Sequence, residues 1–351
     1  MLTFFNEHHA QHRDGGEPAP WQERPVPYGP DALELTLAEF ERRGLGRIVT
    51  PHGVPLVSLE RVHTPRYLHF LRTAWSEWTA LDPGNAARAL LPALWPLRGI
   101  SEPLGERGDE PAHFLARVGL YAADSHTLLG AGTWTAAKTG ADCAVNAAHA
   151  LRMGERATLA LTCPPGRHAG ADWFGGGGFL NNAALAAQHL LDDGMARVAV
   201  LDIGRHHGHG TQHIFYARAD TLFVSIHLDP RGAYPFYLGH AGEQGTGAGL
   251  GCNMNLPLAA GSGSAQWFAA LETACLKLAM FRPAALVVSL GGDIAPSFGL
   301  QGGDFLRIGE RIAHLGLPTT FIFEGGKAAP ESGASVGTNT VNVLEGFETA
   351  A

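Results

Sequence analysis

Short apolar runs alternate with alanine-rich amphipathic segments through the second half of the chain, and this alternation limits the folds open to it. The candidate strands are Val198–Leu201, Leu222–His227, Leu286–Leu290 and Pro318–Phe323. The candidate helices are Ala183–Leu191, Trp267–Met280 and Phe305–Leu315. Strands that alternate with helices favour a parallel sheet, because each crossover helix covers one of its faces. We therefore expect one α/β domain over residues 1–351, a three-layer α/β/α arrangement around a mostly parallel sheet.

Composition limits the function more than the fold. The 351 residues are 45% hydrophobic, which is enough for one large core. The formal net charge of −8 argues against a nucleic-acid partner and mildly favours cationic partners. Cys143, Cys163, Cys252 and Cys275 form no Cys-x-x-Cys pair, which is typical of reduced thiols in a cytoplasmic protein. We expect no secretion signal and no membrane association, because the sequence lacks a basic-then-apolar leader and a run of about 18 apolar residues.

A histidine-rich segment directly follows the candidate strand Val198–Leu201. Residues 202–212 read Asp-Ile-Gly-Arg-His-His-Gly-His-Gly-Thr-Gln. Open α/β sheets form their sites at the carboxyl ends of strands. Aspartate and histidine side chains are also common ligands of divalent metals. We therefore expect the functional site at this strand end.

This segment resembles the Asp-x-Asp-x-His-His-Gly-Asn-Gly-Thr-Gln stretch of the acetylpolyamine amidohydrolase and histone deacetylase family. Further stretches resemble family motifs in the same order, namely Thr162–Gly170, Gly178–Ala183, Val224–His227, Gly245–Gly249, Ser289–Asp293 and Glu324–Lys327. The similarity covers nearly the whole chain, which is identified as a member of this family and resembles its bacterial polyamine-deacetylase branch. The resemblance implies the arginase–deacetylase fold and a homodimer.

The resemblance also implies a chemistry. In the family, two aspartates and one histidine hold a zinc ion that activates a water molecule, while a histidine pair transfers protons and a tyrosine stabilises the oxyanion. On this basis His206 and Asp293 are the remaining metal ligands, and His168 is the remaining member of the histidine pair. Asp202 and His209 are expected directly behind them. The resemblance also implies a structural potassium ion near Asp202.

Three of the family's site positions carry other residues in this chain. Gly204 stands where the family has its second zinc-binding aspartate, Arg167 replaces the first histidine of the pair, and Lys327 replaces the tyrosine. Two protein ligands are too few for a tight zinc site. Arginine remains protonated and cannot act as a general base. We therefore expect no cofactor, and zinc only if another ligand compensates for Gly204.

The replacements predict an exchange of charge. Without zinc, the carboxylates of Asp202 and Asp293 would be buried without compensation, which is costly. Arg167 and Lys327 add two positive charges at positions that neighbour zinc in the family. We expect Arg167 within ion-pair reach of Asp202, and Lys327 directed into the space where the family holds its metal. Replacement of Lys327 by alanine should then lower the melting temperature.

Three functions are compatible with these residues. The first is binding of a small cationic or amide-bearing, polyamine-like ligand without conventional zinc hydrolysis. The second is a zinc-dependent amidohydrolase of acetylated polyamines or other acylamines, which recruits a substitute ligand. The third is a metal-independent enzyme with Lys327 as nucleophile and His168 as acid or base. The candidate residues of the ligand pocket are Trp173, Phe174, Phe179, Phe236, Tyr237 and Glu106. A structural alternative is that the histidines at 207, 209 and 213 are ordinary loop residues.

Overall fold

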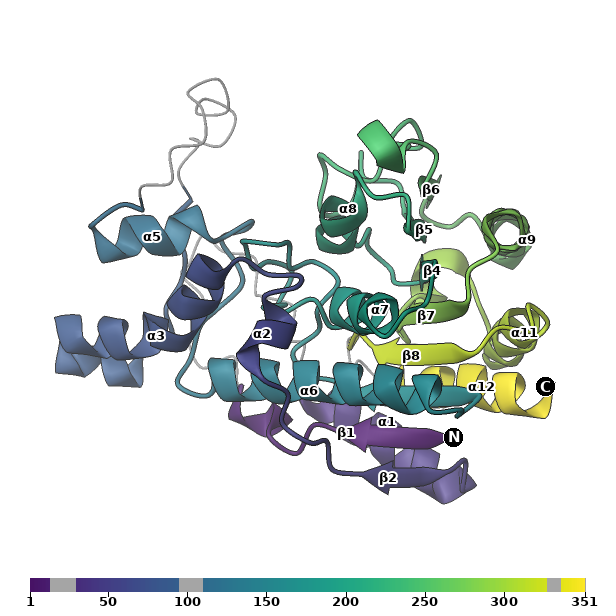
Figure 1. Ribbon diagram of the computed structural model, residues 1–351, viewed down its shortest axis with the longest axis horizontal. Helices are drawn as coiled ribbons and strands as arrows, with labels where there is room; N and C mark the ends of the chain where they lie inside the picture. The colour runs from purple at the N-terminus through teal and green to yellow at the C-terminus, as the bar shows by residue number, and fades with distance from the viewer. Residues whose placement is uncertain (13–29, 95–109, 327–335, 351) are drawn as a thin grey trace.

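The computed structural model of the chain describes residues 1–12, 30–94, 110–326 and 336–350. Its centre is an eight-stranded, entirely parallel sheet with the strand order β2-β1-β3-β8-β7-β4-β5-β6 (Figure 1). The strands are β1 Leu2–Phe5, β2 Arg47–Val49, β3 Ala157–Leu161, β4 Val198–Asp202, β5 Thr221–Leu228, β6 Asn253–Leu258, β7 Ala285–Leu290 and β8 Thr319–Phe323. The predicted α/β fold with a parallel sheet is confirmed.

Two hydrophobic cores cover the two faces of the sheet. One lies under α2 (Leu56–Leu59), α3 (Pro65–Leu81), α5 (Phe114–Leu120), α6 (Thr133–Arg152) and α7 (Asn182–Asp192). The other lies under α1 (Pro30–Arg43), α9 (Ser264–Phe281), α10 (Ala295–Phe298), α11 (Gly302–Ala313) and α12 (Val336–Thr349). Strand β4 supplies Val198 and Val200 to the first core and Ala199 and Leu201 to the second. This is the alternation expected of a strand with both faces buried.

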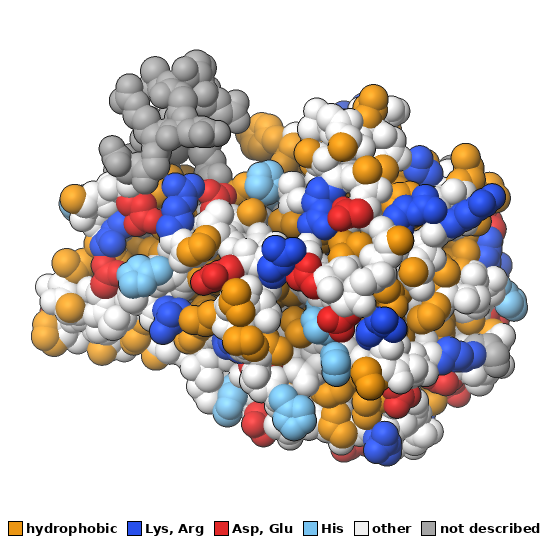
Figure 2. Space-filling view, viewed as in Figure 1, with side chains coloured by type: hydrophobic (Ala, Val, Ile, Leu, Met, Phe, Trp, Pro, Cys, Tyr) orange, Lys and Arg blue, Asp and Glu red, His pale blue; other side chains and the backbone are white. Residues whose placement is uncertain are grey.

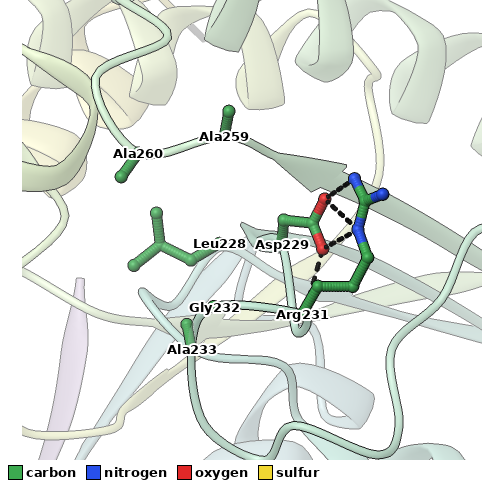
Figure 3. Close-up of a pocket in the computed structure, with 7 residues that line it drawn as sticks. All are labelled: Leu228, Asp229, Arg231, Gly232, Ala233, Ala259 and Ala260. Carbon is green, nitrogen blue, oxygen red and sulfur yellow. Dashed lines mark hydrogen bonds and ion pairs between the residues drawn. The ribbon is translucent and has the colours of Figure 1, made fainter.

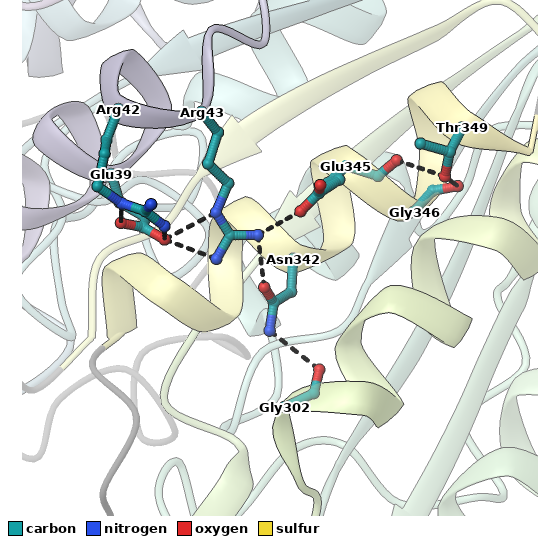
Figure 4. Close-up of polar contacts among 8 residues, drawn as sticks. All are labelled: Glu39, Arg42, Arg43, Gly302, Asn342, Glu345, Gly346 and Thr349. Carbon is teal, nitrogen blue, oxygen red and sulfur yellow. Dashed lines mark hydrogen bonds and ion pairs between the residues drawn. The ribbon is translucent and has the colours of Figure 1, made fainter.

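The helices on the second face are joined by close backbone contact and by polar side chains. A Cβ added at Gly309 of α11 would lie 1.9 Å from the carbonyl oxygen of Val343 on α12, so only glycine allows this approach. Arg43 of α1 donates from Nη1 to Asn342 Oδ1 at 2.8 Å and pairs with Glu345, both on α12 (Figure 4). Asn342 donates in turn to the carbonyl oxygen of Gly302 at 2.9 Å. Helices α1, α11 and α12 therefore pack as one unit.

The surface is mixed in charge. Lys and Arg side chains are interspersed with Asp and Glu over the face shown in Figure 2, so the described residues there form no field of one sign. Among the described helices, none is both long and apolar enough to cross a membrane.

The strand order brings five loops together at one edge. Because all strands are parallel, their carboxyl ends meet at the same edge of the sheet. Strands β3, β8, β7, β4 and β5 are consecutive neighbours, and every residue of these five strands is buried. The loops that follow them carry the residues predicted for the site.

A candidate ligand site at the strand ends

Asp202, the last residue of β4, is fully buried at the floor of the site. Its Oδ1 accepts a hydrogen bond from the N–H of Gly204 at 2.9 Å, and its Oδ2 lies against the backbone of Gly208. Burial raises the pKa of Asp202 to about 7, while the charge of Arg167 acts in the opposite direction and lowers it. The charge of Arg167 therefore acts on the carboxyl group of Asp202, although burial has the larger effect, and an ion pair between the two stays a prediction.

Arg167 follows β3 and reaches across the floor with only 2% of its surface exposed. Its Nη1 donates to the carbonyl oxygen of Glu324 at 3.2 Å, and its Nε points to that of His206 at 3.4 Å. The side chain therefore spans from the loop after β8 to the loop after β4. A guanidinium with several donors suits this position, because it can bind separate carbonyl groups at once.

Gly204 provides the room for this guanidinium. A Cβ built at position 204 would lie 2.8 Å from Arg167 Nε, 2.9 Å from Arg167 Cζ and 3.0 Å from Asp202 Oδ1. The two distances to Arg167 are shorter than a real Cβ tolerates, so the guanidinium would have to shift, and the distance to Asp202 is a tight contact. The residue that removes a metal ligand and the residue that adds a positive charge are therefore neighbours in space.

Glu324, the first residue after β8, is a second buried acid at the floor. Its carboxylate accepts from the N–H groups of Gly166 at 2.7 Å and Arg167 at 3.0 Å, and from the hydroxyl of Ser289 at 3.1 Å. Burial raises the pKa of Glu324, and the charge of Arg167 and these hydrogen bonds counteract that rise. Glu324 thus holds the loop after β3 in place. The sequence analysis treated it only as part of a motif.

His168 and His209 form a buried pair above the floor. Their Nδ1 atoms lie 3.3 Å apart, and the Nε2 atom of His168 is buried without a hydrogen-bond partner among the described residues. Burial, followed by the charge of Arg167, lowers the pKa of His168 well below its ordinary value. Burial lowers the pKa of His209 to about 4. Both imidazoles are therefore neutral near pH 7, with one Nδ1 donating to the other.

Tyr234 and Asp124 complete the wall, and the sequence analysis missed both. The ring of Tyr234 meets those of His168, His209 and His206 edge-on, at centroid distances of 5.2, 5.5 and 6.0 Å. Its hydroxyl donates to Asp124 Oδ2 at 3.0 Å. The only local signal of this role was a tyrosine in a Tyr-Pro-Phe-Tyr run soon after β5.

A turn formed by Gly175–Gly178 brings backbone directly against His168. Asp124 Oδ2 also accepts from the N–H of Gly176 at 2.5 Å, which fixes the turn. A Cβ at Gly176, where φ is +57°, would lie 2.4 Å from the imidazole of His168. The backbone of this glycine run therefore closely approaches the histidine ring.

The predicted metal ligands His206 and Asp293 are half-buried in the loops after β4 and β7. The zinc expected from the resemblance does not fit the donor set around them. Position 204, the third ligand position, has no side chain, and the adjoining space contains the guanidinium of Arg167. His207 is directed elsewhere, because its Nε2 lies 3.1 Å from Gln212 Oε1 and its ring packs against His227. It therefore does not serve as the substitute ligand.

The predicted pocket aromatics are dispersed. Phe174 and Phe179 are fully buried and stack on each other with ring centroids 5.6 Å apart. Trp173 is 9% exposed and packs on the ring of His213 at 4.1 Å. Phe236 and Tyr237 follow the wall residue Tyr234 but are 54% and 87% exposed. Tyr237 therefore faces solvent, and its place in a ligand pocket stays a prediction. Lys327 and Glu106 lie outside the described residues.

A separate hollow of about 460 Å³ lies on the outer side of the loop after β5 (Figure 3). Its lining consists of Leu228, small residues and the Asp229–Arg231 ion pair, in which Nη2 and Oδ2 are 2.5 Å apart. The two charges satisfy each other, and no further charged side chain lines the hollow. It therefore lacks the convergent polar groups that characterise a ligand site.

Comparisons with known proteins show the family and the fold of the chain. Residues 27–340 match the family described as the histone deacetylase domain. The chain is 44% identical over its full length to the full length of acetylpolyamine amidohydrolase 1 from Pseudomonas aeruginosa, and 37% identical to acetylpolyamine amidohydrolase from Mycoplana ramosa, with 99% of each chain covered. The crystal structure of acetylpolyamine aminohydrolase from Burkholderia pseudomallei superposes with a TM-score of 0.88 at 35% identity, covering 100% of this chain and 99% of the other.

Proposed function

The chain belongs to the histone deacetylase domain family, and from this premise we propose that it binds a small cationic or amide-bearing, polyamine-like ligand in the family pocket without the family's zinc chemistry. The observation that carries the proposal is the guanidinium of Arg167 beside Gly204. It supplies one fixed positive charge to a floor with two buried acids, Asp202 and Glu324. The floor thereby reaches partial charge balance without a metal ion.

The wall residues suit such a ligand. An amide can hydrogen-bond to the buried, unpartnered Nε2 atom of His168, because a neutral imidazole offers one donor and one acceptor. An ammonium group can pack against the ring of Tyr234 and be attracted by the carboxylate of Asp293. The same geometry disfavours the zinc-dependent amidohydrolase, since that reaction needs three protein ligands and an open position on the metal.

Binding and metal content test the proposal together. Calorimetry with an acetylated diamine should give the same affinity in the presence of a chelator and in the presence of added Zn²⁺. Tyr234→Ala should weaken binding, whereas the exposed control His69→Ala should bind like the wild type. Zinc-dependent hydrolysis of the acetyl group, lost on chelation, would overturn the proposal. The cytoplasmic homodimer remains a prediction, for which sedimentation of the purified chain is the direct measurement of assembly.

A further inference from the structure

Three metal-binding side chains meet at the surface, at the carboxyl ends of the helices that precede β3 and β4. His149 lies in the last turn of α6, His189 in the last turn of α7, and Asp193 caps the carboxyl end of α7. One ligand atom from each residue lies within 4.8 Å of the other two. We propose that His149, His189 and Asp193 bind one divalent transition-metal ion, Zn²⁺. The bound ion would join α6 to α7.

The distances match the spacing of ligands around one ion. Asp193 Oδ2 lies 3.7 Å from His149 Nδ1 and 3.4 Å from His189 Nε2. Ligand atoms at the corners of a tetrahedron with metal bonds of about 2.0–2.1 Å are separated by about 3.3–3.5 Å. Small rotations of these side chains would therefore place all three atoms in the coordination shell of one ion.

The hydrogen bonding leaves the ligand atoms available. The Nε2 atom of His189 is itself buried, yet it makes no hydrogen bond among the described residues. Buried polar atoms are normally hydrogen-bonded, whereas this ring nitrogen makes only a long 3.4 Å contact with the Asp193 carboxylate among the described residues, a contact that a shared metal ion would replace. The two imidazole rings lie 5.6 Å apart at an interplanar angle of 57°, an arrangement that keeps them unstacked.

The surrounding charges favour a cation here. Both histidines lie at helix carboxyl ends, where the backbone carbonyl groups carry partial negative charge. The adjacent Asp192 is held by Arg61 at 2.8 Å, and Arg152 donates to the backbone carbonyl of Asp193 at 3.1 Å. The Asp193 carboxylate therefore pairs with no arginine or lysine among the described residues.

The ligand set indicates the class of metal. Two imidazoles and one carboxylate suit Zn²⁺, Cu²⁺ or Ni²⁺ better than Mg²⁺ or Ca²⁺, which prefer oxygen ligands. The His149 side chain is 58% exposed, which leaves room for water at the remaining coordination positions.

Zinc titration of the full chain against a chromogenic chelator tests the site. We expect one Zn²⁺ per chain in the wild type, a loss of at least about tenfold in affinity in His149→Ala and in His189→Ala, and wild-type affinity in His69→Ala. Added Zn²⁺ should raise the melting temperature of the wild type but not of His149→Ala. Co²⁺ should give visible absorption that His149→Ala removes.

The variant His206→Ala separates this site from the pocket. Zinc binding that persists in His206→Ala and disappears in His149→Ala supports the surface site. Absence of binding in the wild type, or binding that His149→Ala leaves unchanged, overturns it. Binding that depends on His206 instead would overturn the surface site and the zinc-free pocket together, whereas loss of the surface site alone leaves the proposed function intact.

Discussion

The guanidinium of Arg167 occupies the space into which a Cβ at Gly204 would project, 2.8 Å from the Nε atom of Arg167. A side chain at position 204 and the present position of the Arg167 side chain therefore exclude each other. Arg167 and Gly204, which the sequence presented as two separate replacements, are therefore linked by steric contact. Reverting either alone disturbs the floor, and reverting both is needed to recover the space for a carboxylate ligand.

A double-mutant cycle measures this exclusion. Gly204→Ala should lower the free energy of unfolding by about 1–3 kcal/mol in the wild type, the usual effect of overpacking. In an Arg167→Ala background the same change should cost less than about 1 kcal/mol, because the obstructing atoms are gone. The control Gly303→Ala, where no atom lies within 4 Å of the added Cβ, should cost almost nothing. Urea denaturation gives all these values, and additive effects would contradict the exclusion.

Zinc binding in the pocket should return only with a combined change. The variant with Gly204→Asp, Arg167→His and Lys327→Tyr restores the family's metal-binding aspartate, its first histidine and its tyrosine, so we expect it to bind Zn²⁺ through the new aspartate at position 204, His206 and Asp293. Gly204→Asp alone should not, because Arg167 remains in place. Both should be measured with His149→Ala, so that the surface site does not contribute. Failure of the combined variant would show that the pocket differs from the family beyond these positions.

His63 makes stability depend on pH on the acid side. Its Nε2 accepts the N–H of Asn181 at 2.9 Å, and burial lowers its pKa from 6.5 to about 4. Below pH 6.5 the unfolded chain takes up a proton that the folded chain refuses until about pH 4. The contribution of neutral His63 to the free energy of unfolding is therefore complete above pH 6.5. It falls by roughly 3 kcal/mol as the pH decreases toward 4. His63→Gln should flatten this part of the stability profile, and His69→Gln should not.

The hydroxyl of Tyr234 should matter less than its ring. Tyr234→Phe removes one hydrogen bond to Asp124, so we expect a loss of about 1 kcal/mol in the free energy of unfolding and nearly unchanged ligand affinity. Tyr234→Ala removes the surface that faces three histidines and should weaken ligand binding clearly. Equal affinities for Tyr234→Ala and the wild type would place the ligand elsewhere.

The sequence predicted the elements with the clearest periodicity. The helices expected at Ala183–Leu191 and Trp267–Met280 occur as Asn182–Asp192 and Ser264–Phe281, because long amphipathic segments carry their own signal. Strands β1 and β2, the last two at one end of the sheet, were not predicted. They have four and three residues, too few to show a period, and their pairing depends on contacts distant in the chain.

The floor of the site was more predictable than its wall. Arg167, Gly204 and Asp202 adjoin strand ends, and the parallel sheet brings such ends together. Asp124 lies in an irregular segment before α6, and nothing in its neighbours indicates that its carboxylate reaches the turn at Gly176. Phe179 shows a similar limit, since an aromatic residue beside a glycine run suits a pocket wall and a core equally.

The contact between the glycine turn and His168 determines which substitutions the pocket tolerates. Any side chain at Gly176 would collide with the imidazole of His168, so we expect substitutions there to be destabilising. Positions 167 and 204, in contrast, can change together without a clash against the wall residues. A mutagenised library selected for new ligands should therefore first accumulate exchanges at the floor. Paired substitution at positions 167 and 204 is therefore the route by which we expect this pocket to change its ligand.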